Sequence, residues 1–425
     1  MTTTWRTVNH PRPRALALAL VTAAALVTTA CSGEAADATS TTTSPTAASQ
    51  SASASPSETA TPTPSPSAAY NVYAGTAPDK FSANVQGHRE LVYVPNTLSN
   101  SVQVIDPKTY QIIDRFGTGK DPHHVVPSWD LTTLYVNDTQ GNDLLPIDPV
   151  TGKAGPKIPV VDPYNLYFAP DGSKALVIAE RFNRIDVADP VTFKLERSLA
   201  MPCGGPNHLD YNKDMSAFVI SCEFTGHLIV VDKDVTEVKK VIDLSPIETP
   251  GATSPQEAWH SGKPQAGLRK GHSAMPQDVR LTPSGKFFLA ADMLRNGVWV
   301  IDASTLEYVK FIQTGKGAHS VYPSRDTKQL YVANRDEGSV TVLDAETLDN
   351  LAKWIIPGGG SPDMGGVTAD GSEFWLSGRY HAEVYVFDTA TGELKHRIKT
   401  NAGSHGLLVW PQPGAFSLGH TGNMR

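Results

Sequence analysis

Histidines gather at one repeated position of this 425-residue chain. Seven segments of the chain can be aligned with one another: DPHHVV, DPYNLY, GPNHLD, MPQDVR, GAHSVY, SPDMGG and GSHGLL. The third and fourth residues of each segment form two adjacent columns of this alignment. Five of these fourteen positions are histidine, although residues 70–425 hold only 12 histidines: His123, His124, His208, His319 and His405. Neutral imidazole suits copper, zinc and iron, so these side chains would form a transition-metal or haem site if the fold brought them together.

A repeat of about 42 residues positions these histidines. A β-rich run that ends in Asp recurs seven times, at Asp106, Asp148, Asp189, Asp232, Asp302, Asp344 and Asp388. The spacings between these residues are 42, 41, 43, 70, 42 and 44. Further β-rich runs flank each copy, without helical periodicity. Four short antiparallel strands per period are typical of a propeller blade, so the sequence predicts an all-β, seven-bladed β-propeller.

The ends of the repeat array predict how the ring closes. The first copy begins at its second strand, Leu91–Asn96, and the array finishes with an unpaired inner strand, His405–Trp410. This last strand would complete the first blade and leave no open edge. The YVxN-like strands, the turns such as Ala169–Gly172 and the VxVID runs resemble the YVTN, or YncE-like, family of β-propellers. The resemblance spans about residues 91–410 and implies the fold, but no particular activity.

In such a ring the inner strands converge on the axis, so we expect their first residues to crowd one end of the central channel. The expected metal ligands are His123, His124, His208, His319 and His405, and His272 and His381 could join them. The loops between second and third strands reach the same end and contribute Arg181, Arg335, Arg379 and Tyr380. Together with Asp278 and Asp363 from the inner-strand starts, they predict a ligand-binding face. A channel is polar and hydrated, so any single histidine could instead bond a neighbouring strand or water. We expect the isolated histidines to lie at the surface: His88, His260, His396 and His420.

One part of this pattern resembles a copper enzyme. Asp121-Pro-His-His124, followed by a strand that ends in Val136-Asn137-Asp138, is similar to the first copper-ligating blade of nitrous oxide reductase. The resemblance implies that His123 and His124 match an adjacent ligand pair and that His208, His319 and His405 match later ligands. The pairs Tyr164/Asn165, Gln277/Asp278 and Asp363/Met364 depart from that pattern, so we do not expect nitrous oxide reduction itself. A more distant resemblance is to the propellers of nitrite reductases that carry a d-type haem.

The first 69 residues predict export. Arg6, Arg12 and Arg14 precede a 13-residue apolar run from Ala15 to Val27, which is typical of a secretory signal and too short to span a membrane. The run leads into a cysteine, Cys31, in a sequence that resembles the lipobox of bacterial lipoproteins. The resemblance implies lipidation of Cys31 and a membrane anchor after residues 1–30 are removed; ordinary cleavage nearby would release a soluble protein. Residues 31–69 are rich in Ser, Thr, Ala and Pro and predict a disordered tether.

Two further features lie within the propeller at residues 70–425. Cys203 precedes an inner strand and Cys222 ends the strand that pairs with it, so we expect a disulfide in an oxidising compartment; a thiolate pair beside His208 is the alternative. About 28 extra residues between Leu244 and His272 exceed a simple connection and indicate a lid or a partner-binding loop. Each repeated Asp is expected to accept backbone N–H groups in the turn that follows it.

Charge and motifs leave three classes of function open. The formal charge is −7, and it becomes −10 (33 basic against 43 acidic residues) when the first 30 residues are removed. The sequence has no block of basic residues that would indicate nucleic-acid binding. The simplest hypothesis is an exported binding module at the outer face of the cell membrane, with an unknown protein or small-molecule ligand at the channel face. The second is a redox protein or carrier that binds copper, another transition metal or haem. The third is a lactonase-like hydrolase whose divalent metal is held by carboxylates and amides: Asn165, Asn207, Asp278 and Asp363.

Overall fold

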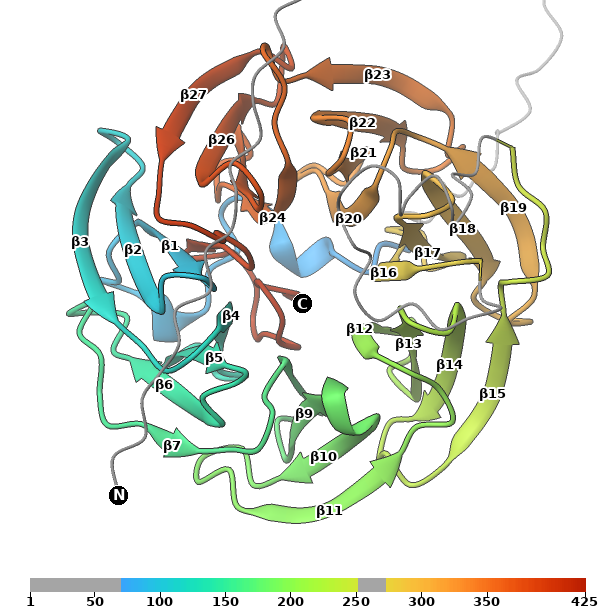
Figure 1. The fold of residues 1–425 in the computed structure, drawn as a ribbon, viewed down its shortest axis with the longest axis horizontal. Coiled ribbons are helices and arrows are strands. Elements are labelled where there is room, and N and C mark those ends of the chain that lie inside the picture. The colour runs from blue at the N-terminus through green and yellow to red at the C-terminus, as the bar shows by residue number, and fades with distance from the viewer. Residues whose placement is uncertain (1–69, 251–272) are drawn as a thin grey trace, which may run out of the picture. The chain divides into compact units, whose positions relative to one another are not determined.

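The computed structural model describes residues 70–250 and 273–425. Seven four-stranded antiparallel sheets surround a central axis (Figure 1), which confirms the predicted seven-bladed propeller. The predicted signal (1–30), the tether (31–69) with Cys31, and most of the insertion at 244–272 lie outside the described residues. Within the described part of the chain, no helix has the length and apolar character that a membrane crossing requires.

Each blade runs from an inner strand at the axis to an outer strand at the perimeter. The first four blades, inner strand first, are β28 (Leu408–Trp410), β1 (Leu91–Asn96), β2 (Ser101–Asp106), β3 (Gln111–Gly117); β4 (Pro122–Pro127), β5 (Leu134–Asp138), β6 (Asp143–Ile147), β7 (Ile158–Pro159); β8 (Asn165–Phe168), β9 (Ala175–Ala179), β10 (Arg184–Ala188), β11 (Leu195–Ala200); and β12 (Pro206–Tyr211), β13 (Ala217–Cys222), β14 (His227–Asp232), β15 (Val238–Asp243).

The remaining blades have six-residue strands throughout. They are β16 (Pro276–Leu281), β17 (Phe287–Asp292), β18 (Gly297–Asp302), β19 (Tyr308–Gln313); β20 (Ala318–Pro323), β21 (Gln329–Asn334), β22 (Ser339–Asp344), β23 (Asn350–Ile355); and β24 (Pro362–Val367), β25 (Glu373–Gly378), β26 (Glu383–Asp388), β27 (Leu394–Lys399). Among the described residues, three single-turn 3₁₀ helices accompany them: η1 (Ala74–Thr76), η2 (Ala83–Val85) and η3 (Glu180–Phe182).

The ring closes as the sequence predicts. Strand β28 pairs antiparallel with β1, with Leu91 opposite Trp410 and Tyr93 opposite Leu408. The closing strand is shorter than the expected His405–Trp410, because regular pairing begins only at Leu408. The first blade therefore combines the two ends of the repeat array.

The apolar core lies between neighbouring blades. Inner and middle strands are buried almost throughout, whereas outer strands such as β27 alternate between half-buried and exposed positions. In one cluster, Ile178 of the third blade packs with Ile220 of the fourth and with Leu418 from the segment after β28. Because burying one such side chain contributes about 1.5–3 kcal/mol, these interfaces hold adjacent blades in a fixed orientation.

The repeated aspartates are structural, as predicted. Asp148 accepts hydrogen bonds from the amides of Val150 and Thr151, and Asp344 accepts from those of Glu346 and Thr347. Such turns hold the third strand against the outer strand of each blade.

One of these turns allows a test of stability against pH. The Ser304 hydroxyl, with the amides of Thr305 and Ser304, lowers the pKa of Asp302 to about 2 from an ordinary value of 3.8. A carboxyl group whose folded-state pKa is lowered stabilises the fold above pH 3.8 and loses this contribution as the pH falls toward 2. We predict that Asp302→Ala lowers Tm by about 1–2 °C at pH 6 and has no effect near pH 2, measured by circular dichroism. Asp302→Asn, which keeps an oxygen acceptor but does not titrate, is the control. A difference between wild type and Asp302→Ala that stays constant from pH 6 to 2 would contradict the assignment.

Candidate metal centre and channel cavity

Five of the seven inner strands carry a bulge where they begin. In β4, Pro122 pairs with Asp138 and Val125 pairs with Val136, so His123 and His124 together face a single residue of β5. The same two-against-one register occurs at the start of β12, β16 and β24, and β20 carries one extra residue, His319. Bulges redirect side chains away from the regular alternation of a strand. Most residues of the two aligned sequence columns are these bulged residues, and the others stand at the same place in β8, in β20 or before β28. Together the two columns form what we call the rim of the channel.

The rim brings the predicted histidines together. The rings of His123 and His405 lie 4.4 Å apart between centroids, and those of His124 and His405 lie 5.0 Å apart. His208 extends this contact to His319 at 6.4 Å. All five side chains are at most 7% exposed. The expected convergence of imidazoles is therefore present.

A sixth histidine, which the sequence analysis placed at the surface, completes the centre. His420 is 1% exposed, and one ring nitrogen of each of His124, His208 and His420 lies within 4.8 Å of the others. The surface prediction for His420 is wrong because the segment after β28 turns back into the channel. His88 and His396 do lie half-buried near the surface: His88 is tilted against Trp410, and His396 is stacked on Tyr110. His260 lies outside the described residues.

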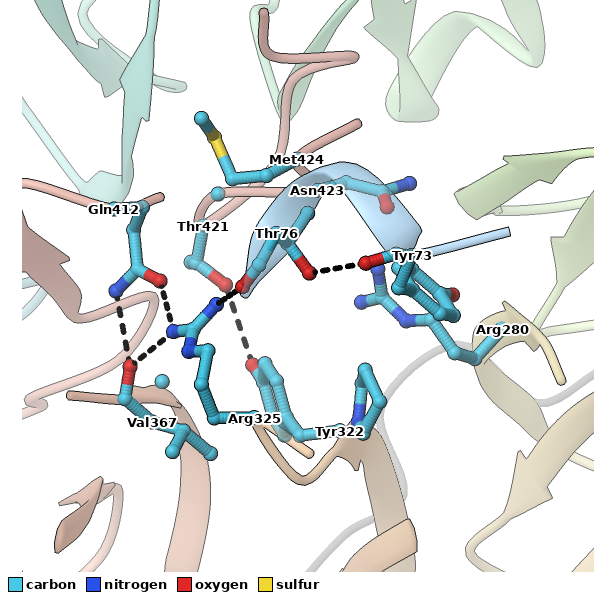
Figure 2. A pocket seen from close by; sticks show the side chains of 13 residues that line it. Tyr73, Thr76, Arg280, Tyr322, Arg325, Val367, Gln412, Thr421, Asn423 and Met424 are labelled. Carbon is cyan, nitrogen blue, oxygen red and sulfur yellow. Dashed lines mark hydrogen bonds between the residues drawn. The ribbon is translucent and has the colours of Figure 1, made fainter. Parts of the chain in front are cut away.

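The segment 411–425 occupies the end of the channel opposite the rim. The His420 amide donates to the Leu166 carbonyl at 2.9 Å, and the Arg425 guanidinium donates to buried Asp210 at 2.6 Å. Figure 1 shows the C-terminus and η1 in the middle of the ring. Figure 2 shows a small cavity of about 50 Å³ at this end, where Arg325 bonds Gln412 and the Val367 carbonyl. Chain segments thus fill this end and hold His420 in place.

Hydrogen bonds at Nδ1 orient the three imidazoles. The Nδ1 of His124 lies 2.9 Å from the Tyr164 carbonyl, which makes this nitrogen a donor and leaves Nε2 with its lone pair. The Nδ2 amide group of Asn165 reaches Nδ1 of His208 at 2.8 Å and Nδ1 of His420 at 3.1 Å, while its Oδ1 accepts from the Leu166 amide. Among the described residues, no hydrogen-bond partner meets Nε2 of any of the three. Three unpartnered nitrogens in one buried space are what a bound ion or water would satisfy.

Burial keeps these imidazoles neutral. Desolvation holds the pKa of His124, His208 and His420 well below its usual range, and nearby imidazoles lower it further. Neutral imidazole is the form that binds metal.

A second group of rim residues is organised by a buried carboxylate. The Asp363 carboxylate accepts hydrogen bonds from Nδ1 of His405 at 2.5 Å and from Nε of Arg335 at 3.0 Å. Nδ1 of His319 lies 3.1 Å from the same carboxylate. Burial acts to raise the pKa of Asp363, but Arg335 and then His319 hold it below the ordinary value. This carboxylate therefore fixes the ring of His405 and neutralises Arg335.

Above the rim lies a cavity of about 270 Å³. His123, His319 and His405 form its floor, and loops between second and third strands contribute Glu180, Glu223 and Arg379. Of the predicted ligand face, Arg335, Arg379 and Tyr380 line this cavity.

The other predicted site residues lie elsewhere. Arg181 turns away to buried Asp162, at 2.5 Å, and Asp278 is buried beside Arg280. His381 is exposed and bonds Ser361, whereas His272 lies outside the described residues. A disulfide joins Cys203 and Cys222, so these sulfurs are not free thiolates. The sequence pattern located the loops of this face but could not show the direction of each side chain.

Comparison with known proteins agrees with this fold. A family model described as "YNCE-like beta-propeller" matches residues 59–248 and 264–413, which is most of the chain. The chain belongs to the YncE-like β-propeller family. No curated protein matches it.

Solved structures resemble this YncE-like propeller in fold at low sequence identity. Hydrazine synthase of Kuenenia stuttgartiensis is 17% identical, with 76% of this chain and 94% of that chain covered and a TM-score of 0.53. A functionally unknown protein of Desulfotomaculum acetoxidans is 16% identical, and the match covers 74% of this chain and 98% of that chain with a TM-score of 0.54. The dihydro-heme d1 dehydrogenase NirN, in complex with DHE, is 14% identical, and the match covers 78% of this chain and 77% of that chain with a TM-score of 0.54.

The packing of His124 in the YncE-like ring is testable through a glycine. A Cβ atom added at Gly406 would lie 2.2 Å from Cδ2 of His124. We predict that Gly406→Ala lowers the free energy of unfolding by about 1–3 kcal/mol in a denaturant titration, because the ring must move. Gly117→Ala is the control, since a Cβ there meets nothing within 4 Å. Equal destabilisation by the two substitutions would show that His124 is not packed against residue 406.

Proposed function

We propose that this propeller binds one transition-metal ion through Nε2 of His124, His208 and His420. The observation that carries the proposal is the set of three buried, neutral imidazoles whose Nε2 atoms have no partner. A metal–imidazole bond measures about 2.0–2.1 Å, so an ion at the centre needs the rings to approach by less than about 1 Å. Copper is the first choice and zinc the second, because affinity for nitrogen ligands peaks at copper.

The amide of Asn165 would set the state of this site. As it lies, its NH₂ group faces Nδ1 of His208 and His420, which leaves the proton of each ring on Nε2. A water among the three rings suits that arrangement, with His124 as its acceptor. If the amide turned over, Oδ1 would accept from both Nδ1–H groups and free both Nε2 atoms for a metal, and the bound metal would have to offset the loss of the hydrogen bond from the Leu166 amide to Oδ1. The rotation of one amide would therefore separate a hydrated site from a metal-binding site.

Several earlier hypotheses fit the site less well. The three nitrogens include one from the C-terminal segment, which departs from the inner-strand ligands implied by nitrous oxide reductase, so we do not propose its copper–sulfide chemistry. A cavity of about 270 Å³ is smaller than the roughly 300–1,000 Å³ of sites for drug-sized ligands, and haem does not fit it. Asp278 and Asp363 are each paired with an arginine, so they are poor ligands for the cation of a lactonase.

We also propose that the protein works outside the cytoplasm, anchored to the membrane through Cys31. The basic, apolar and small-residue pattern before Cys31 supports export, and the Cys203–Cys222 disulfide supports an oxidising compartment. The binding-module hypothesis is the second candidate function. The cavity above the rim favours it.

The metal proposal is tested by elemental analysis. The exported protein is purified without chelator, exposed to one equivalent of copper(II) or zinc, desalted and analysed by mass spectrometry. We predict about one equivalent per chain for wild type and less than 0.2 for His420→Gln, because two imidazoles cannot retain the ion through desalting.

Two histidines outside the triad provide controls. His319→Gln removes a buried rim imidazole, and His396→Gln removes one stacked on Tyr110, and both variants should retain the ion. Retention by a folded His420→Gln variant would refute the assigned ligands, and a wild-type protein that takes up neither metal would refute the proposal.

The role of Asn165 is tested by a carboxylate. We predict that Asn165→Asp tightens copper or zinc binding about 10- to 100-fold, because a carboxylate can only accept from Nδ1–H of His208 and His420. Competition with a chromophoric chelator measures the change. Asn165→Ala removes the amide without supplying an acceptor and should not tighten binding. Weaker binding by a folded Asn165→Asp variant would show that the amide does not set the protonated nitrogen.

A further inference from the structure

The cavity above the rim separates opposite charges across the channel. Glu180 follows the second strand of the third blade and Glu223 that of the fourth, whereas Arg335 and Arg379 follow those of the sixth and seventh. In a seven-bladed ring these pairs of neighbouring blades stand on opposite sides of the axis (Figure 1). A molecule in the cavity would therefore meet carboxyl groups on one side and guanidinium groups on the other.

The basic side has one charge to offer a ligand. Arg335 is already engaged by Asp363, at 3.0 Å from its Nε. Arg379 forms no such contact: its Nη1 is buried without a hydrogen bond, and its charge acts only from a distance on Asp121 and Asp363, whose pKa values it lowers. Nε2 of His405, which lines the same cavity, is also buried without a partner. Because Nδ1–H of His405 donates to Asp363, this Nε2 is an acceptor, so an anionic group such as a carboxylate would be held by the Arg379 guanidinium.

The acidic side is arranged for a cation. Glu223 accepts from Nε2 of Gln277 at 2.9 Å, and Oε1 of Glu180 is buried without a hydrogen bond. Burial and the adjacent Glu223 raise the pKa of Glu180 well above its usual range, so Glu180 holds a proton that a bound ammonium group could displace.

The size and the remaining wall of the cavity limit the ligand. About 270 Å³ corresponds to the volume of roughly nine water molecules, which suits a free amino acid rather than a peptide. Between the charged sides lie apolar groups, Phe224, Met275 and Met293, which pack together in one cluster.

From these contacts we propose that the cavity binds a small zwitterion, an α-amino acid with an apolar side chain. Its carboxylate is held by Arg379, its ammonium group by Glu180 and Glu223, and its side chain by the methionines. This site is separate from the metal centre, and the proposal goes beyond the metal-binding function.

Three probes of one shape test the inference at pH 7: L-leucine, 4-methylpentanoate, which lacks the ammonium group, and 3-methylbutylamine, which lacks the carboxylate. Isothermal titration calorimetry is carried out on the chelator-treated and on the copper-loaded protein. We expect L-leucine to bind the chelator-treated protein with a Kd below about 1 mM and each analogue to bind at least 10-fold more weakly. Binding of L-leucine only after copper loading would overturn the inference, because the ligand would then be held by the ion.

Charge-removing variants locate the site. Arg379→Gln and Glu180→Gln should each weaken L-leucine binding at least 10-fold, whereas Arg197→Gln, on outer strand β11, should leave it unchanged. Metal retention by the two cavity variants, measured as above, distinguishes this inference from the metal proposal, since neither residue belongs to the triad. The inference is overturned if L-leucine fails to bind, if the analogues bind equally well, or if both cavity variants bind as wild type does.

Discussion

The pairing of β28 with β1 is the contact on which the other features depend. It joins the two ends of the repeat array into one blade, and it fixes the point at which the chain leaves the ring. Trp410 ends that strand at the side of the channel opposite the rim, so residues 411–425 begin there and turn inward. The strand that closes the fold therefore also delivers His420 to the axis, where it meets His124 and His208. Ring closure and the assembly of the candidate metal centre are one structural event.

The fold could be predicted because it is periodic. The aspartates at intervals of about 42 residues, with β-rich runs on both sides, mark strands whose pairing is local within each blade. The rim could also be found, because four inner strands carry a two-residue bulge and a fifth carries a one-residue bulge at the same place in the repeat. His124, His208 and His319 therefore share aligned columns, and His405 holds the same place before β28.

The rest of the site is not periodic, and the sequence analysis missed it for that reason. His420 follows the last repeat, so no column assigns it a place, and its burial depends on how the segment 411–425 packs. Asn165 looked like a departure from the histidine pattern, yet its amide contacts two of the three imidazoles. Arg181 and Arg379 occupy comparable loops, but buried Asp162 draws the first away from the cavity. Such outcomes depend on individual side-chain partners.

The filling of one end of the channel has a consequence for exchange. Residues 411–425 and the η1 turn lie in the middle of the ring, and the cavity above the rim lies at the other end of the channel. An ion that entered from the cavity would reach the triad through the space that a cavity ligand would occupy. On this route the ion would have to bind before the small molecule, and it could leave only after the small molecule had dissociated. The bound small molecule would slow dissociation of the ion by blocking its route, without contacting the ion.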